Sequence, residues 1–357
     1  MQAIIDQYKA TIRAAAEQKT PLQIRGGGTK DFYGNSVVAQ NNTLLDATAY
    51  SGIIDYEPTE LVITARAGTR LADLEAALDQ KGQMLAFEPP YFGAAATLGG
   101  CIAAGLSGPR RAAAGSVRDF VLGVRLLNGK GDDLNFGGQV MKNVAGYDVS
   151  RLMVGAMGTL GMLLEVSLKV LPKPVTEITL HMQMDGAVAI EKMNQWAGRP
   201  LPISATCYRN GELLLRLSGA ESAVRAAQLK LGGEELRESE IFWRSIREQT
   251  HGFFQSASSL WRLSINPTTP PLNLPAEQLI EWNGGLRWLL GDEKLNAVTI
   301  HKAAKDAGGH ATLFRSNEPG VSVLHPLDPG MMKIHCVLKE KFDPSGILNP
   351  GRLYPEM

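Results

Sequence analysis

The stretch that most constrains the fold is LQIRGGGTK, residues 22–30, where three consecutive glycines follow a short apolar run and one arginine. The alternation of Leu22 and Ile24 is typical of a strand that ends at Arg25. Three glycines contribute no packing and lose more backbone entropy on folding than other residues. They present bare N–H groups, so such a loop is either simply flexible or closes around an anion. Both interpretations stay open for this stretch alone.

The loop fits a Rossmann dinucleotide site poorly. A G-x-G-x-x-G loop is followed directly by a helix, with an acidic residue about 20 positions later. Here the chain continues as GGGTKDFYGNS, in which Asp31, Gly34 and Asn35 keep it turn-like. A backbone nest for a pyrophosphate, supported by the charge of Arg25, is the better hypothesis.

Two more glycine clusters follow, ATLGGCIAAGLSGPRR at residues 96–111 and KNVAGYDVSRLMVGAMGTLG at 142–161, with GSVRDFVLG at 115–123 between them. Small residues let the backbone approach a large flat or charged ligand without interference from side chains. Helix packing explains Gly155 and Gly158 nearly as well if each is judged alone. Arg110 and Arg111 either pair with phosphate or are solvated.

The spacing of apolar residues predicts an α+β chain. Strands are expected at 60–66, 84–87 and 161–171, with a helix that begins after Thr69 as its N-cap and stops at Gly82. Pro172 and Pro174 close this first region, for which we predict a domain of residues 1–173. Its dense glycines set it apart from the chain that follows.

Beyond Pro174 the pattern predicts a smaller antiparallel sheet covered by helices. Residues 178–184 alternate as a strand, helices are expected near 186–197, 220–231 and 296–307, and Asn210-Gly211 predicts a hairpin turn. LWRLSI, GLRWLL and residues 310–314 read as further strands. We predict a second domain over 174–325 and a turn-rich tail, 326–357, that returns to another surface.

Composition excludes several classes of function. Lysine plus arginine and aspartate plus glutamate each number 36, and this zero net charge argues against a nucleic-acid binder. No window approaches about 18 uninterrupted apolar residues, so no membrane span is expected. Cys101, Cys207 and Cys336 are too few and too far apart for a disulfide framework or for a thiolate metal or iron–sulfur site. A reducing cytoplasm is the simplest compartment.

Taken in order, the motifs resemble a known family. Over residues 10–173 the chain is similar to the FAD-binding domain of the vanillyl-alcohol oxidase and para-cresol methylhydroxylase superfamily. Four ordered motifs carry this resemblance: strand–RGGG, PP…ATLGG, GSVRDFVLG and GYD…GxxGxLG. FDPSGILNPGR resembles the C-terminal signature of its 2-hydroxy-acid branch, in which the tail returns to the flavin. KTPLQIRGGGTKDF, YEPTELVITARAGT and AGGHAT resemble the FAD-binding subunits of three-subunit bacterial glycolate oxidases over essentially the whole chain.

This resemblance implies a two-subdomain FAD-binding domain of the para-cresol methylhydroxylase type and a smaller antiparallel α+β cap domain. It also implies cofactor contacts from the glycine clusters. Some relatives bind the flavin covalently through a histidine where this chain has Thr29, so noncovalent FAD is expected. The implied FAD-binding residues are Arg25, Gly26, Gly27, Gly28, Thr29, Thr97, Leu98, Gly99, Gly100, Gly105, Gly108, Gly115, Ser116, Val117, Asn143, Gly146, Tyr147, Asp148, Gly158 and Gly161.

The catalytic relatives carry signatures similar to HxGDGN and EHG, which supply histidines, a carboxylate and a metal. Neither signature occurs in this sequence, so no metal site and no assigned catalytic residue are expected. His310, in AGGHAT, is a weak candidate for a group near the flavin, and a structural histidine is the alternative.

The resemblance therefore implies an FAD-dependent oxidoreductase subunit in a complex that oxidises glycolate to glyoxylate. Its flavin would relay electrons between a catalytic flavoprotein subunit and an iron–sulfur subunit. A degenerate structural subunit and a stand-alone 2-hydroxy-acid dehydrogenase are the alternatives. The expected location is the cytoplasm, or the inner face of the membrane through the partner subunits.

Overall fold

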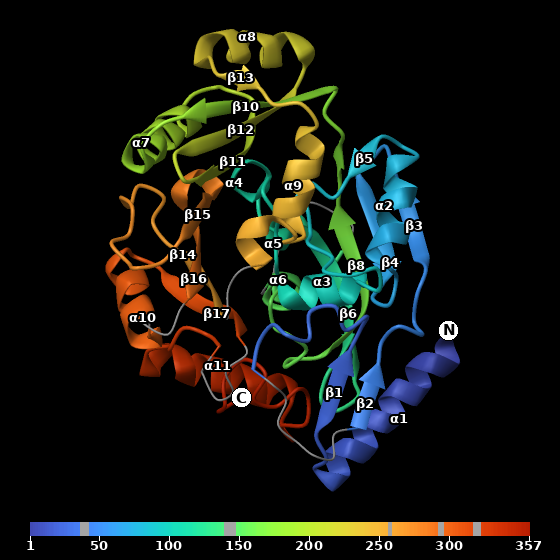
Figure 1. Cartoon of the computed structure of the whole chain (residues 1–357). Helices are drawn as coiled ribbons and strands as arrows, with labels where there is room; N and C mark the ends of the chain where they lie inside the picture. Colours follow the sequence, from blue (N-terminus) through green and yellow to red (C-terminus); the bar gives the residue numbers. More distant parts are fainter. Residues whose placement is uncertain (36–42, 139–147, 256–258, 292–295, 317–322) are drawn as a thin grey trace.

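The computed structural model describes residues 1–35, 43–138, 148–255, 259–291, 296–316 and 323–357. Two large antiparallel sheets dominate it, one on each side of Pro174 in the sequence (Figure 1). The division of the chain into three parts at residues 173 and 325 stays a prediction. The α+β class expected from the sequence is confirmed.

The first region begins with a helix and a small parallel sheet. Ile5, Tyr8 and Ile12 of α1 are buried and pack in one cluster with β1 and β2. A five-stranded sheet of order β3-β4-β8-β6-β7 follows, with short helices against it. Its elements are α1 (Gln2–Gln18), β1 (Leu22–Arg25), β2 (Thr43–Asp46), β3 (Ile53–Glu57), β4 (Val62–Arg66), α2 (Leu71–Asp79), β5 (Gln83–Met84), α3 (Leu98–Ala104), α4 (Arg111–Ala114), α5 (Val117–Phe120), β6 (Val121–Leu127), β7 (Asp133–Gly137), α6 (Val149–Leu152), β8 (Met162–Lys169) and β9 (Leu171–Pro172).

The second region is an eight-stranded antiparallel sheet of order β13-β10-β12-β11-β15-β16-β14-β17. Apolar residues on its outer face pack with the helices α7, α8 and α10, whereas the inner face contacts the first region. Its elements are β10 (Thr176–Gln183), α7 (Gly186–Ala197), β11 (Ile203–Arg209), β12 (Glu212–Gly219), α8 (Glu221–Leu231), β13 (Glu234–Glu235), α9 (Ser239–Arg247), η1 (Gly252–Gln255), β14 (Ser259–Ser264), β15 (Gln278–Glu281), η2 (Trp282–Gly284), β16 (Leu286–Gly291), α10 (Ala297–Asp306) and β17 (His310–Ser316).

The C-terminal segment returns to the first strand. It begins with helix α11 (Pro329–Phe342), in the lower part of the view in Figure 1. Leu348 then forms a parallel bridge with Leu22 of β1. The ammonium of the buried Lys339 donates to the carbonyls of Thr159 and Leu348 and to the Asp343 carboxylate, at 2.9, 2.6 and 2.7 Å. These bonds fix the tail beside the first glycine loop.

Three local predictions were wrong in detail. The N-cap of α2 is Arg70, because the Thr69 hydroxyl accepts a hydrogen bond from the Gly52 N–H at 2.9 Å instead of capping the helix. The strand expected over 84–87 is limited to the pair Gln83–Met84, since only these two residues pair with β9. The tail expected to be turn-rich contains the helix α11.

Candidate functional site

The first glycine loop packs so closely on a neighbouring segment that side chains are excluded. A Cβ at Gly27 would lie 1.5 Å from the carbonyl oxygen of Ala95, and one at Gly26 would lie 2.4 Å from the Thr97 hydroxyl. Gly28 has a φ of +70°, which glycine adopts without strain. The three glycines are therefore required by close approach and by backbone conformation, not by flexibility.

Helix α3 begins at the opposite wall. Thr97 is its N-cap and accepts a hydrogen bond from the Gly100 N–H at 3.2 Å. A Cβ at Gly99 would lie 2.8 Å from that of Ala67, so the helix start lies directly against the end of β4. The first loop and the start of α3 thus face each other with little side-chain bulk between them.

Between these walls lies a cleft that is open to solvent. It is lined by residues of the first glycine loop, of α3 and of the C-terminal tail. Arg25, Lys30 and Arg352 line it with one carboxylate, Asp31, so its charged lining is positive overall. The predicted cofactor residues that line it are Arg25, Gly26, Gly27, Gly28, Thr29, Thr97, Gly99, Gly100, Gly158 and Gly161.

The C-terminal tail supplies two lining residues that the sequence did not single out. The Asn349 side chain accepts from the Ile24 N–H at 2.8 Å and donates to the Met157 carbonyl at 2.7 Å. The Arg352 guanidinium donates to the carbonyls of Tyr33 and Asn35 at 2.6 and 2.8 Å. The sequence signal for them is the FDPSGILNPGR ending, whose resemblance implied a tail that returns to the flavin but did not single out these two residues.

Other predicted cofactor residues lie outside the lining of this cleft. Leu98 and Val117 are buried in the core of the first region. Ser116 and Asp119 form a capping box at α5, and the Asp148 side chain accepts from the Arg151 N–H as the N-cap of α6. Three predicted glycines, Gly105, Gly108 and Gly115, also lie outside the lining of the cleft. Asn143, Gly146 and Tyr147 are outside the described residues.

The GLSGPRR segment joins the two regions. The Gly108 carbonyl accepts from the Trp282 indole at 3.0 Å, and the Arg111 guanidinium lies 4.4 Å from the centre of the Trp282 ring. Arg110 is only 8% exposed, so the solvated alternative is wrong for it. Its guanidinium donates to Glu177 of β10 at 2.6 Å.

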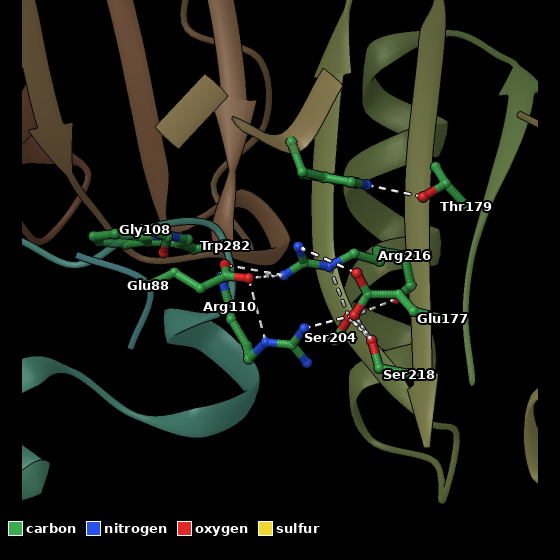
Figure 2. A network of polar contacts seen from close by, with 10 residues as sticks. Glu88, Gly108, Arg110, Glu177, Thr179, Ser204, Arg216, Ser218 and Trp282 are labelled. Atoms are coloured by element: carbon green, nitrogen blue, oxygen red, sulfur yellow. Dashed lines mark hydrogen bonds and ion pairs between the residues drawn. The ribbon is translucent and has the colours of Figure 1, made fainter. Parts of the chain in front are cut away.

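Figure 2 shows the network around Arg110. Glu88, on the loop before α3, lies between Arg110 and Arg216 of β12, with N–O distances of 3.4 and 2.8 Å. Ser204 and Ser218 complete it through hydrogen bonds to Arg216 and Glu177. Burial opposes ionisation of Glu88, but the two guanidinium groups outweigh it and lower the pKa of this carboxyl. These charges fix how the eight-stranded sheet sits on the first region.

A second, smaller cavity lies between the two regions. Arg262, Glu281 and Gln249 line it. Burial raises the pKa of Glu281 to about 7, although its carboxylate accepts from the Trp288 indole at 2.8 Å. Burial lowers the pKa of Arg262, and the Gln249 side-chain oxygen is buried without a hydrogen-bond partner among the described residues. No motif in the sequence signals this set.

His310 lies elsewhere, at the start of β17. His310 is not among the described residues that line the cleft or the second cavity. Its ring centre is 6.5 Å from that of His325, which lies 4.9 Å from His301. Burial, Arg262 and His325 all lower the pKa of His310. The described part of the chain contains no group of three metal-ligating side chains arranged for an ion.

Comparison with known proteins decides the family. A family model described as "FAD binding domain" matches residues 4–137. The chain is 48% identical over 356 residues to the glycolate oxidase subunit GlcE of Escherichia coli K12, covering 100% of this chain and 98% of that protein. The chain belongs to the family of the glycolate oxidase subunit GlcE. The resemblance found in the sequence is thereby confirmed.

More distant relatives match about half of this GlcE-family chain. The glycolate oxidase subunit GlcD of Bacillus subtilis is 31% identical over 175 residues, 49% of this chain and 37% of that protein. A D-lactate dehydrogenase of Anaerostipes hadrus is 30% identical over 175 residues, 49% of this chain and 36% of that protein.

Solved structures confirm the fold. An alkyldihydroxyacetonephosphate synthase superposes with a TM-score of 0.64 at 15% identity, over 97% of this chain and 74% of that one. The predicted FAD-binding fold of the para-cresol methylhydroxylase type is therefore confirmed. Among the helices in the described ranges, none is long and apolar enough to cross a membrane.

Proposed function

We propose that this chain is the FAD-binding subunit of a glycolate oxidase complex that oxidises glycolate to glyoxylate, and that it relays electrons between a catalytic flavoprotein subunit and an iron–sulfur subunit. The observation that carries the proposal is the cleft between the first glycine loop, α3 and the C-terminal tail. Membership of the GlcE family supports the same assignment. A GlcD-type subunit is the natural catalytic partner.

The residues of the cleft fit FAD. The loop at Gly26–Gly28 offers bare N–H groups, and a Cβ at Gly26 or Gly27 would collide with Thr97 or Ala95. The positive lining of the cleft suits two phosphate groups. When bound, FAD supplies a ring that exchanges one or two electrons, whereas the protein positions it and sets its electrostatic surroundings. Thr29 lines the cleft where some relatives have a linking histidine, which supports noncovalent binding.

We propose as cofactor-binding residues the sequence-predicted residues that line the cleft, together with Asn349 and Arg352 of the same lining. Arg25 is an exposed cation beside the loop and pairs with Asp31 at 2.7 Å. Arg352 and Asn349 hold the loop and the segment at Met157 in position through backbone carbonyls and N–H groups. The proposed location, at the inner face of the membrane or in the cytoplasm, follows from the partner subunits.

A second candidate function is direct oxidation of a 2-hydroxy acid by this chain. The cavity that holds Arg262 and Glu281 favours it. Arg262 carries a charge suited to a substrate carboxylate, and a carboxyl with a pKa of about 7 is suited to accept a hydroxyl proton. His310 would not be required in this case.

Stopped-flow mixing separates the two candidates. The FAD-loaded chain is mixed with glycolate while flavin absorbance is followed, first alone and then with the partner subunits. The relay function predicts that the flavin stays oxidised alone and is reduced in the complex. Rapid bleaching without partners, abolished by Glu281→Gln, would establish the second candidate instead.

A further inference from the structure

The second cavity, between the two regions, contains an arginine whose charge no carboxylate neutralises at close range. Of the two arginines that line it, Arg247 donates to the Glu248 carboxylate at 2.8 Å. The Arg262 guanidinium is half-buried and lies 5.2 Å from the centre of the Trp282 ring. Among the described residues it has no ion-pair or hydrogen-bond partner, and the Glu281 carboxylate acts on it only at longer range. A guanidinium has five N–H donors, so this one is free to meet a ligand.

A second guanidinium adds positive charge beside the cavity. Arg111 lies 4.4 Å from the centre of the same Trp282 ring, and burial and the charge of Arg262 both lower its pKa. Burial is also the main cause that lowers the pKa of Arg262. Two poorly hydrated like charges against one ring are stabilised by an anion that binds beside them. The charge of the cavity therefore favours an anionic ligand.

Two acceptors of the lining indicate what else this ligand carries. The Gln249 side-chain oxygen is buried and receives no hydrogen bond from the described residues. A buried acceptor without a donor is costly, so a ligand with a hydroxyl group would relieve this cost. The Glu281 carboxylate would repel an anion with more than one charge. A small acid with one carboxylate and one hydroxyl group matches this set.

The charge of Glu281 is open to change when an anion arrives. Burial raises the pKa of this carboxyl to about 7. The side chains that act on it are those of Trp288, Arg262, Glu88 and Arg216. Among them, Glu88 acts in the same direction as burial. The thiol of Cys207, paired with it on β11, has a raised pKa and stays protonated. A further negative charge in the cavity would shift this carboxyl to its neutral form near neutral pH.

We propose that the second cavity binds the anion of a small 2-hydroxy acid, with its carboxylate on Arg262 and its hydroxyl on Gln249, and that Glu281 takes up one proton from solvent when the acid binds. The proton converts the Glu281 carboxylate into a neutral acid, so the net charge of the cavity does not change on binding. The inference holds whether or not this chain oxidises the acid. Only the choice of glycolate as the acid rests on the proposed function.

The test of proton uptake is isothermal titration calorimetry of the purified chain with sodium glycolate at about pH 6 and about pH 8. The wild-type affinity should be about tenfold weaker at the higher pH, because Glu281 must then be protonated on binding. Titrations at the higher pH in two buffers of different ionisation enthalpy should give an uptake approaching one proton per glycolate. In Glu281→Gln the two affinities should agree within about twofold, without proton uptake.

Two comparisons test the assignment of the ligand groups. Arg262→Met should weaken glycolate binding at least about tenfold at the lower pH, and Arg262→Gln covers the case in which the methionine variant does not fold. Arg225→Met is the matched control, because it removes an exposed guanidinium that pairs with Glu235. Acetate lacks the hydroxyl and should bind at least about fivefold more weakly than glycolate, since the Gln249 oxygen then stays unpaired.

Each part of the inference can fail separately. No saturable heat with glycolate, or an unchanged affinity in folded Arg262→Met or Arg262→Gln, would overturn the site. Equal affinities for acetate and glycolate would overturn the assignment to hydroxy acids, and a wild-type affinity that is the same at both pH values would overturn the proton uptake. The flavin absorbance of the same samples tests the proposed function, which a chain that takes up no FAD would refute, whereas the calorimetry alone decides this inference.

Discussion

Replacing Glu88 by glutamine removes one negative charge from the network that joins the first region to the eight-stranded sheet (Figure 2). In this variant the Arg216 guanidinium still has the Glu177 carboxylate at 3.8 Å and still donates a hydrogen bond to the Ser204 hydroxyl at 3.0 Å. Removing one partner of a buried ion pair costs about 3–5 kcal/mol. The Glu177 carboxylate still pairs with the Arg110 guanidinium at 2.6 Å. We therefore expect the free energy of unfolding to fall by an amount at the lower end of this range, about 3 kcal/mol.

Urea and thermal unfolding of Glu88→Gln measure this loss. At roughly 2–4 °C per kcal/mol for a domain of about 150–250 residues, the transition that unfolds the joined regions should fall by about 6–12 °C. Asp306→Asn is the matched control, because it also removes one carboxylate from an ion pair, the exposed Lys302–Asp306 pair of α10 at 2.6 Å. Its effect should stay within about 0.5 kcal/mol.

The pH dependence gives a second readout. The pKa of Glu88 is lowered in the folded chain, so its contribution is present above the unfolded pKa of about 4.3. That contribution is lost as the pH falls through the lowered folded value. The difference in stability between wild type and Glu88→Gln should therefore shrink in acid. Equal stability of the two proteins at neutral pH would refute the view that this network joins the regions.

Two further variants test the cleft. Gly27→Val should give folded protein without flavin, since a Cβ there would lie 1.5 Å from the Ala95 carbonyl oxygen. Gly252→Ala is the control and should keep its flavin, because nothing lies near the added Cβ. Full flavin occupancy in Gly27→Val, measured by absorbance, would contradict the site. Asn349→Ala should lower the free energy of unfolding in urea by about 1–3 kcal/mol and weaken FAD binding, because the Ile24 N–H loses its partner. An unchanged free energy of unfolding together with an unchanged affinity for FAD would remove Asn349 from the site.

Local patterns in the sequence were enough for much of the second region. The apolar spacing of Ile190, Met193 and Ala197 predicted a helix at 186–197, which is where α7 lies. Asn210 and Gly211 both have positive φ, as the hairpin turn between β11 and β12 requires. Helix α11 was not predicted, although Asp328 and Pro329 form a helix start and Met331, Ile334 and Val337 recur at helical spacing. These three apolar side chains are exposed in the structure.

The site was only partly accessible to such reasoning. The glycine loop is recognisable because close approach demands consecutive glycines. Asn349 is bonded to Ile24 across 325 positions of sequence, and Glu88 to Arg216 across 128. Arg262 and Glu281 become neighbours of one cavity only through the pairing of β14, β15 and β16. No spacing rule encodes contacts of this range, since they depend on how whole sheets pack.

The central claim is that the cleft holds FAD without a covalent bond. The most direct measurement is the absorption spectrum of the purified chain, followed by acid precipitation and analysis of the supernatant. We predict flavin bands from one FAD per chain and complete release of that FAD into the supernatant. A chain without flavin bands after incubation with FAD, or flavin that stays with the precipitated polypeptide, would contradict the claim.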